Sequence, residues 1–274
     1  MASVDVGKAI DFVRASGDPI LSALALLAIG ETTTRQALEV LSAYQRPDGG
    51  WTKTDKDFQG DLSAISTTWV ALQWLGWIED RDSDVLERTI AHVRDVQRDD
   101  GAWDEPDEIL AYDPPTWMMP GRHENQLWLT AAICCKLKEM GREGDVDLER
   151  ALGFVRAGWD GQRFPVFVHT HWMAMPLLAM HGAGDEEIVE GCRRFLSQAI
   201  ADDRVDPGDY CAVAYASLLT GEPAEGLCRV SLQRVQENQM RDGGWRTNYD
   251  PKHRVGFTVD ALFLLRRAGL LGDR

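Results

Sequence analysis

Polar side chains that could transfer protons or bind ions stand at the beginnings of five apolar segments. Imidazole and carboxyl groups are the common proton donors and acceptors of active sites. Four of the six histidines of the chain belong to this set, whereas His92 and His181 lie elsewhere and are expected to be structural or solvated. The set comprises Asp61 and Ser63; His123, Glu124 and Asn125; His169 and His171; Asp209, Tyr210 and Cys211; and His253 and Arg254.

The segments that position these residues are of two kinds, which alternate along the chain. Amphipathic segments carry apolar residues at i, i+4 and i+7, and they begin near Val6, Arg35, Asp84, Asp147, Glu186 and Gly226. The other segments are apolar on nearly every face, which is typical of helices that are buried on most sides. They are Pro19–Ile29, Ala64–Trp77, Leu127–Leu137, Phe167–Met180, Ala212–Leu219 and Phe257–Leu265.

A Q-x-x-D-G-x-W phrase recurs at Gln45–Trp51, Gln97–Trp103 and Gln239–Trp245, with a degenerate copy at Trp159–Phe164. Glycine permits the positive backbone angles that end a helix and reverse the chain. The tryptophan ring can cover the joint, and the glutamine amide offers both donors and acceptors to exposed backbone ends. We interpret the phrase as a structural clasp, which indicates a repeat fold and no catalyst.

Six outer and six inner helices in strict alternation predict an all-α fold, an (α/α)6 barrel that occupies residues 1–274 as a single domain. Such alternation makes the inner helices parallel, so that their N-termini, which favour anions, gather at one mouth of the barrel. We therefore expect the polar residues named above to face one cavity. The proline-rich stretch Asp104–Gly121 is expected to form part of a rim or lid.

Composition restricts the partners and the compartment. A formal charge of −15 argues against nucleic acid as a partner and limits membrane contact to a peripheral one. The start Met1–Asp5 lacks the features of a signal peptide. Five cysteines without disulfide or zinc-finger spacing indicate the reducing cytoplasm. The oligomeric state is not predicted.

The three phrases and the helix alternation resemble the prenyltransferase/squalene oxidase repeat of squalene–hopene cyclases and protein prenyltransferase β-subunits. This resemblance implies an α-toroid whose cavity holds an isoprenoid chain against aromatic walls. Aromatic faces attract cations, including carbocations. The rings on inner helices that could form such walls are Trp69, Trp128, Trp172, Tyr215 and Phe257.

The same resemblance indicates Asp209 as a catalytic acid. Squalene–hopene-type cyclases carry a D-x-D-D-T-A element whose middle aspartate protonates an alkene or epoxide. The stretch Pro207–Ala212 matches it only at that aspartate, Asp209, and at the final alanine. A lone carboxyl in apolar surroundings keeps its proton, as a donor requires. His123, His169 and His253 are further catalytic candidates, and Arg254 is a candidate for substrate binding.

Protein prenyltransferases suggest a second interpretation. They bind zinc through an Asp-x-Cys pair and a histidine at the start of the next inner helix, a pattern that Asp209, Cys211 and His253 reproduce. A simpler alternative makes Asp209 a helix N-cap and Cys211 a small buried residue. In the pair His169 and His171, we expect one imidazole to face the cavity and the other to be structural.

The sequence supports three hypotheses for function. The first is a stand-alone terpene cyclase-like enzyme that uses Asp209 as its acid and binds a small hydrophobic isoprenoid. The second is a zinc-dependent prenyltransferase-like enzyme that uses Asp209, Cys211 and His253. The third is a non-catalytic toroid that binds a lipid or a protein, which the loss of two of the three motif aspartates favours.

Overall fold

The computed structural model describes residues 4–165, 167–221 and 226–271. These residues form twelve α-helices and four short 3-10 helices, and they contain no β-strand. The odd-numbered helices are the amphipathic series: α1 (Val6–Ala15), α3 (Thr34–Ser42), α5 (Asp84–Asp95), α7 (Leu148–Ala157), α9 (Glu186–Ala201) and α11 (Gly226–Glu237). The even-numbered helices are the apolar series: α2 (Pro19–Ala28), α4 (Ile65–Ile78), α6 (His123–Met140), α8 (Val168–His181), α10 (Tyr210–Leu219) and α12 (Arg254–Arg267).

All the helices expected from the periodicity are present, and the largest differences lie at the starts of two apolar helices. Helix α6 begins at His123 rather than Leu127, and α12 begins at Arg254 rather than Phe257. The first turn of a helix leaves its N–H groups without partners inside the helix. Polar residues are therefore readily accommodated there, and an apolar run alone places the start of the helix too late.

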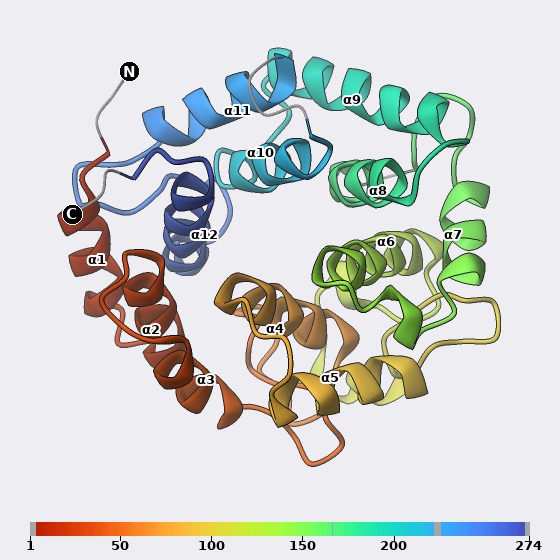
Figure 1. Ribbon diagram of the computed structural model, residues 1–274, viewed down its shortest axis with the longest axis horizontal. Coiled ribbons are helices and arrows are strands. Elements are labelled where there is room, and N and C mark those ends of the chain that lie inside the picture. Colours follow the sequence, from red (N-terminus) through yellow and green to blue (C-terminus); the bar gives the residue numbers. More distant parts are fainter. Residues whose placement is uncertain (1–3, 166, 222–225, 272–274) are drawn as a thin grey trace. The chain divides into compact units, whose positions relative to one another are not determined.

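The chain divides into two compact units. One unit consists of Met1–Val40 and Arg193–Arg274, and the other of Leu41–Cys192. In the first unit, α12 packs against α1, α2 and α10, and α10 packs against α11 (Figure 1). In the second unit, α6 packs against α4, α7 and α8, and α4 packs against α5. The prediction of one domain over residues 1–274 stays a prediction.

Helix α4 receives its cap from a distant part of the chain, whereas α1, α2, α5 and α7 are capped by the side chain of the residue before them. Ala64 precedes α4 and cannot cap it. Instead, the carboxylate of Glu105 accepts hydrogen bonds from the backbone N–H groups of Ile65, at 2.7 Å, and Ser66, at 3.0 Å. A carboxylate at a helix N-terminus satisfies unpaired donors and interacts favourably with the helix dipole. Glu105 therefore fixes the start of α4.

The long proline-rich stretch is anchored rather than loose. It contains two 3-10 helices, η1 (Asp107–Tyr112) and η2 (Thr116–Met118). Ile109 and Met118 are fully buried and pack in one apolar cluster with Phe58 and Ala64. This burial gives the stretch a packed inner face, whereas the expectation of a rim or lid is left untested.

Each Q-x-x-D-G-x-W phrase closes a turn and ties it to other helices, as the interpretation of a clasp predicts. The glutamine amide donates to the glycine carbonyl of its own turn. It also donates to a backbone carbonyl at the start of an odd-numbered helix, which is Val85 in the first copy, Asp147 in the second and Asp5 in the third. The three tryptophans, Trp51, Trp103 and Trp245, are 0 % exposed. Their backbone N–H groups donate to the hydroxyls of Thr68, Thr130 and Thr258 on even-numbered helices.

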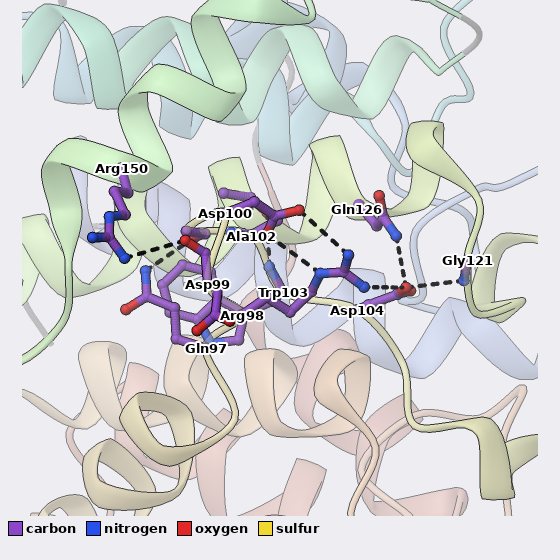
Figure 2. A network of polar contacts seen from close by, with 12 residues as sticks. Gln97, Arg98, Asp99, Asp100, Ala102, Trp103, Asp104, Gly121, Gln126 and Arg150 are labelled. Atoms are coloured by element: carbon purple, nitrogen blue, oxygen red, sulfur yellow. Dashed lines mark hydrogen bonds and ion pairs between the residues drawn. The ribbon is translucent and has the colours of Figure 1, made fainter.

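Figure 2 shows the second copy, where the acidic residues around the turn also have partners. Arg98 contacts Asp100 and Asp104, and the carboxylate of Asp104 accepts hydrogen bonds from the Gln126 side chain and the Gly121 backbone. These bonds join the end of α5 to the loop before α6 and to α6 itself. The clasp is thus a joint between three consecutive elements.

The degenerate copy keeps the same design with different residues. Phe164 is buried in place of the tryptophan, and its backbone N–H donates to Nε2 of His171 at 3.1 Å, where the other copies use a threonine. The other ring nitrogen of His171 contacts the carbonyl oxygen of Phe167 at 3.2 Å. His171 therefore has the structural role that was expected of one member of the His169 and His171 pair.

The third copy connects the two ends of the chain within the first unit. The Gln239 amide donates to the carbonyl oxygen of Asp5 at 2.8 Å, and its side-chain oxygen accepts from the Asp5 backbone N–H at 2.7 Å. Asp5 is also the N-cap of α1, where it accepts a hydrogen bond from the backbone of Lys8. The end of α11 thus holds the start of α1 in place.

Replacing Gln239 by alanine should destabilise the protein by about 1–3 kcal/mol, because three hydrogen bonds are lost and each contributes about 1 kcal/mol net. Chemical denaturation of the full chain measures this loss. The matched control is Gln233→Ala on α11, which removes only an exposed hydrogen bond to Glu237 and should change stability by less than about 0.5 kcal/mol. Equal effects of the two variants would contradict the clasp.

Candidate active site

Asp209 lies in a tight turn at the start of α10, and its carboxyl group points away from the helix N-terminus. It occupies the N-cap position but makes no side-chain capping bond. Instead, Oδ2 accepts a hydrogen bond from the phenol hydroxyl of Tyr249 at 2.8 Å, and the residue is 8 % exposed. Asp209 therefore stands at the N-cap position, as the simpler alternative predicts, but its side chain does not cap the helix. Cys211, by contrast, is the small buried residue that this alternative described.

A second aspartate holds the turn and the loop that carries Tyr249. The carboxylate of Asp206 accepts hydrogen bonds from the backbone N–H of Gly208, from the Thr247 hydroxyl at 2.7 Å and from the Asn248 backbone at 2.8 Å. This one carboxylate joins the 206–209 turn to the 246–250 loop. The loop comes directly after the third clasp, so the repeat fold determines where Tyr249 can reach.

Aromatic rings cover the turn. The Tyr249 ring stacks on Phe257 of α12, with 6.2 Å between centroids and an interplanar angle of 22°. The Phe257 ring lies so close to Gly208 that a Cβ at that position would be 2.6 Å from ring carbons. Only glycine fits there without displacement of the ring. The ring of His253 meets Tyr249 edge-on at 6.4 Å.

The environment of the turn favours neutral carboxyl groups. Burial raises the pKa of Asp209 to about 7, with a smaller contribution from the charge of Asp206, whereas the hydrogen bond from Tyr249 acts in the opposite direction. Burial likewise raises the pKa of Asp260 to about 7, and the charge of Asp209 adds to this rise. Burial also raises the pKa of Tyr249, with Asp209 as a further cause. A proton donor that works near neutral pH requires such an acid.

Tyr249 and Asp260 are not among the residues that the sequence pattern singles out. The sequence could have indicated Asp260, because it is the one acidic residue in the middle of an even-numbered helix. The other acidic residues of these helices are two glutamates near the two ends of α6. An ionisable residue inside an apolar run calls for an explanation. The sequence could not have indicated Tyr249 in this way, because it lies in an irregular loop and its contact with Asp209 spans 40 residues.

The predicted zinc site is not formed. Among residues 4–165, 167–221 and 226–271, no group of three or more His, Cys, Asp or Glu side chains could hold a metal ion. Within the predicted set, the Asp209 carboxylate is engaged by Tyr249, and the ring of His253 packs against the same tyrosine. Burial, the largest cause, and the charges of Asp260 and Asp209 raise the pKa of the Cys211 thiol well above its usual value.

Two other predicted residues of the first unit have partners away from Asp209. The guanidinium of Arg254 donates to the Trp245 carbonyl and to Asp242 at 2.8 Å, and it lies over the ring of Phe12. Arg254 is thus part of the third clasp. Tyr215 on α10 accepts a hydrogen bond from Arg267, whose guanidinium also lies over its ring.

The second unit contains the remaining predicted residues. Trp69 of α4 and Trp128 of α6 meet edge-on at 5.7 Å, and Trp117 of η2 joins them at 5.9 Å from Trp128. Two of the five predicted aromatic residues are therefore in contact in this unit, and Trp117 is a member of the cluster that was not foreseen. A cluster of three indole rings offers a wide apolar and electron-rich surface.

The two histidine candidates of this unit differ in their surroundings. The ring of His169 contacts Trp172 at 4.6 Å, and burial lowers its pKa to about 4. It is thus a neutral imidazole at physiological pH. His123, in contrast, is exposed and packs on Phe154 of the odd-numbered helix α7. A catalytic role of His123 stays a prediction.

The raised pKa of Asp209 makes a prediction for stability. The pKa of Asp209 in the folded state is about 7, above the usual 3.8, so the folded state binds more protons than the unfolded state between these pH values. The stability that this proton binding contributes is lost as the pH rises from about 4 to about 7. Between pH 5 and pH 8, the free energy of unfolding of Asp209→Asn should therefore fall by about 2 kcal/mol less than that of the wild type. Urea titrations at both values measure this difference. The control Asp11→Asn, which changes an exposed carboxylate of α1, should keep the wild-type dependence, and a parallel course of all three proteins would contradict the assignment.

No helix in the described part of the chain is long and apolar enough to cross a membrane. No family model and no curated protein matches the amino-acid sequence.

Solved structures do match the fold. The type II terpene cyclase MstE from Scytonema, in its apo form, is 16% identical with a TM-score of 0.57, over 86% of this chain and 82% of that chain. A variant of MstE in complex with its substrate geranylgeranyl dihydroxybenzoate is 14% identical with a TM-score of 0.60, over 97% of this chain and 88% of the other. A protein from Actinoplanes is 15% identical with a TM-score of 0.58, over 98% and 92%. The likeness confirms the predicted all-α fold class, that of the terpene cyclase-like α/α toroids.

Proposed function

We propose that this chain is a terpene cyclase-like enzyme that protonates a carbon–carbon double bond of an isoprenoid, with Asp209 as the acid. The observation that carries this proposal is the buried Asp209 carboxyl, whose single hydrogen bond within the described residues comes from Tyr249 to Oδ2. The other oxygen, Oδ1, is left to carry the proton. A protonated carboxyl that faces apolar surroundings is the donor that this chemistry needs.

The reaction begins with transfer of the Asp209 proton to one carbon of the double bond. The π electrons form the new C–H bond, and the neighbouring carbon becomes a cation that the next double bond of the chain attacks. The carboxylate left on Asp209 is stabilised by the Tyr249 hydroxyl, which already donates to it. Loss of a proton from the final cation gives a cyclised isomer of the substrate.

Aromatic faces near the acid suit the cation that forms. Tyr249 and Phe257 stack beside the turn of Asp209, and an aromatic face contributes about 0.5–2 kcal/mol to the binding of a cation. The substrate class we propose is a geranylgeranyl-type isoprenoid, since a structural neighbour is described with geranylgeranyl dihydroxybenzoate as its substrate.

Incubation of the purified chain with geranylgeranyl dihydroxybenzoate, geranylgeranyl diphosphate, farnesyl diphosphate, squalene and oxidosqualene tests the proposal. Chromatography coupled to mass spectrometry should reveal a product of the same mass as one substrate with a different retention time. Asp209→Asn should lower kcat by about 10²–10⁴-fold, because general acid catalysis contributes that much. Asp11→Asn on the surface of α1 should leave kcat unchanged. Binding without turnover would favour the non-catalytic toroid, and no binding of any probe would remove both.

Tyr249→Phe separates the two roles of the phenol group. Loss of its hydrogen bond, which lowers the pKa of Asp209, should raise that pKa, so the decline of kcat on the alkaline side should move to higher pH. The maximal kcat should fall by about tenfold, since a hydrogen bond to a charged group is worth roughly 1.5–3 kcal/mol. A pH–rate profile measures both effects, and an unshifted alkaline limb would exclude this role of Tyr249.

A further inference from the structure

Asp260 is a carboxyl group without a structural task. It lies in the middle of α12 between the buried residues Val259 and Ala261, and Asp260 itself is partly exposed. Within the described residues, its side chain has no hydrogen bond and no ion pair, unlike Asp206 and Glu105. The loss of contact with water disfavours the charged form of such an unpaired carboxyl group, and it raises the pKa of Asp260 to about 7.

The face of α12 that carries Asp260 is turned toward the Asp209 turn. Phe257 lies three residues earlier, and residues at i and i+3 share one face of a helix. The Phe257 ring contacts Gly208, which is the neighbour of Asp209, and stacks on Tyr249, which is bonded to Asp209. Helices α10 and α12 pack against each other. The contacts of Phe257 therefore place the face of α12 that carries Asp260 beside the Asp209 turn.

The titratable groups that face this place are acids, apart from the imidazole of His253, which packs against Tyr249. Asp206 faces the pair from the 206–209 turn, Tyr249 faces it from the 246–250 loop, and Cys211 faces it from α10. The thiol of Cys211 interacts electrostatically with both Asp209 and Asp260, which places it near the two carboxyl groups.

We propose that Asp260 is a positioning residue for the acid, and that it forms with Asp209 a carboxyl pair which holds one proton at neutral pH. Repulsion between two like charges is mutual, so the ionisation of either carboxyl keeps the proton on the other. The D-x-D-D element has further aspartates beside its catalytic one, and these are missing beside Asp209. Asp260 on α12 takes the place of such a second carboxyl group. The role of the pair in catalysis rests on the proposed function, whereas the sharing of one proton between the two carboxyl groups does not.

The pair also affects the charge of the site after proton transfer. When Asp209 gives its proton to the double bond, the Oδ1–H bond breaks and the pair carries two negative charges. These charges stand opposite the new carbocation and stabilise it electrostatically. The return of one proton from solvent then restores the pair for the next cycle.

The test is a titration of carboxyl groups in the full-length chain labelled with ¹³C at aspartate side chains, followed by NMR from acid to alkaline pH. The wild type should show two coupled midpoints, one of them near neutral pH. In Asp260→Asn, the midpoint of Asp209 should fall by about one pH unit or more, because one negative neighbour is gone. In Asp209→Asn, the midpoint of Asp260 should fall likewise. The control Asp11→Asn should leave both midpoints unchanged.

An Asp209 midpoint that is the same in the wild type and Asp260→Asn would overturn the proposal. If Asp260→Asn does not fold, the Asp209→Asn arm decides, because the coupling must appear from either side. With a substrate in hand, the alkaline limb of kcat in Asp260→Asn should move to lower pH, a shift that a merely structural role would not produce. If the two carboxyl groups titrate together but no isoprenoid is turned over, the proposed enzymatic function is contradicted and the carboxyl pair stands. If an isoprenoid is turned over but the two groups titrate independently, the carboxyl pair is contradicted and the enzymatic function stands.

Discussion

The glutamine amide of the repeated clasp joins helices that lie far apart in the sequence, and the arrangement of the fold depends on this contact. Its NH2 group bonds at once to the carbonyl of its own turn and to a backbone group at the start of another helix. The buried tryptophan of the same phrase bonds to a threonine on the next apolar helix. Because one short phrase fixes three elements, a small number of polar contacts sets the register of a chain whose helices otherwise meet through non-directional apolar packing.

The candidate site contains groups that are unfavourable for stability, in contrast to the clasps. Asp209 and Asp260 are carboxyl groups in apolar surroundings, where ionisation is disfavoured. Nothing in the packing of α10 and α12 requires either of them. Strain of this kind is common at functional sites, where the surrounding fold is stable enough to hold an unfavourable group. The well-bonded Asp206, which fastens the 206–209 turn to the 246–250 loop, supplies that support here.

The sequence was informative where local physics decides the structure. Hydrophobic periodicity located all twelve helices, and the glycine and tryptophan of the repeat identified the clasp. It was less informative about roles that depend on distant partners. The third clasp engages Arg254, which had been expected to bind substrate, and Phe164 engages His171. The contact between Tyr249 and Asp209 depends on how an irregular loop closes, and no local pattern encodes that closure. Recognition of a D-x-D-D remnant found Asp209, but its second carboxyl partner lies on another helix.

The bond between Gln239 and Asp5 has a consequence for how the protein is made. The two residues are separated by 234 positions, so the first helix cannot receive its final anchor until nearly the whole chain has left the ribosome. Contacts of such long sequence separation delay folding, and until they form, apolar surfaces of the early helices remain open to other chains. The final anchoring of α1 therefore follows the synthesis of Gln239, which makes this chain a candidate for chaperone assistance during synthesis.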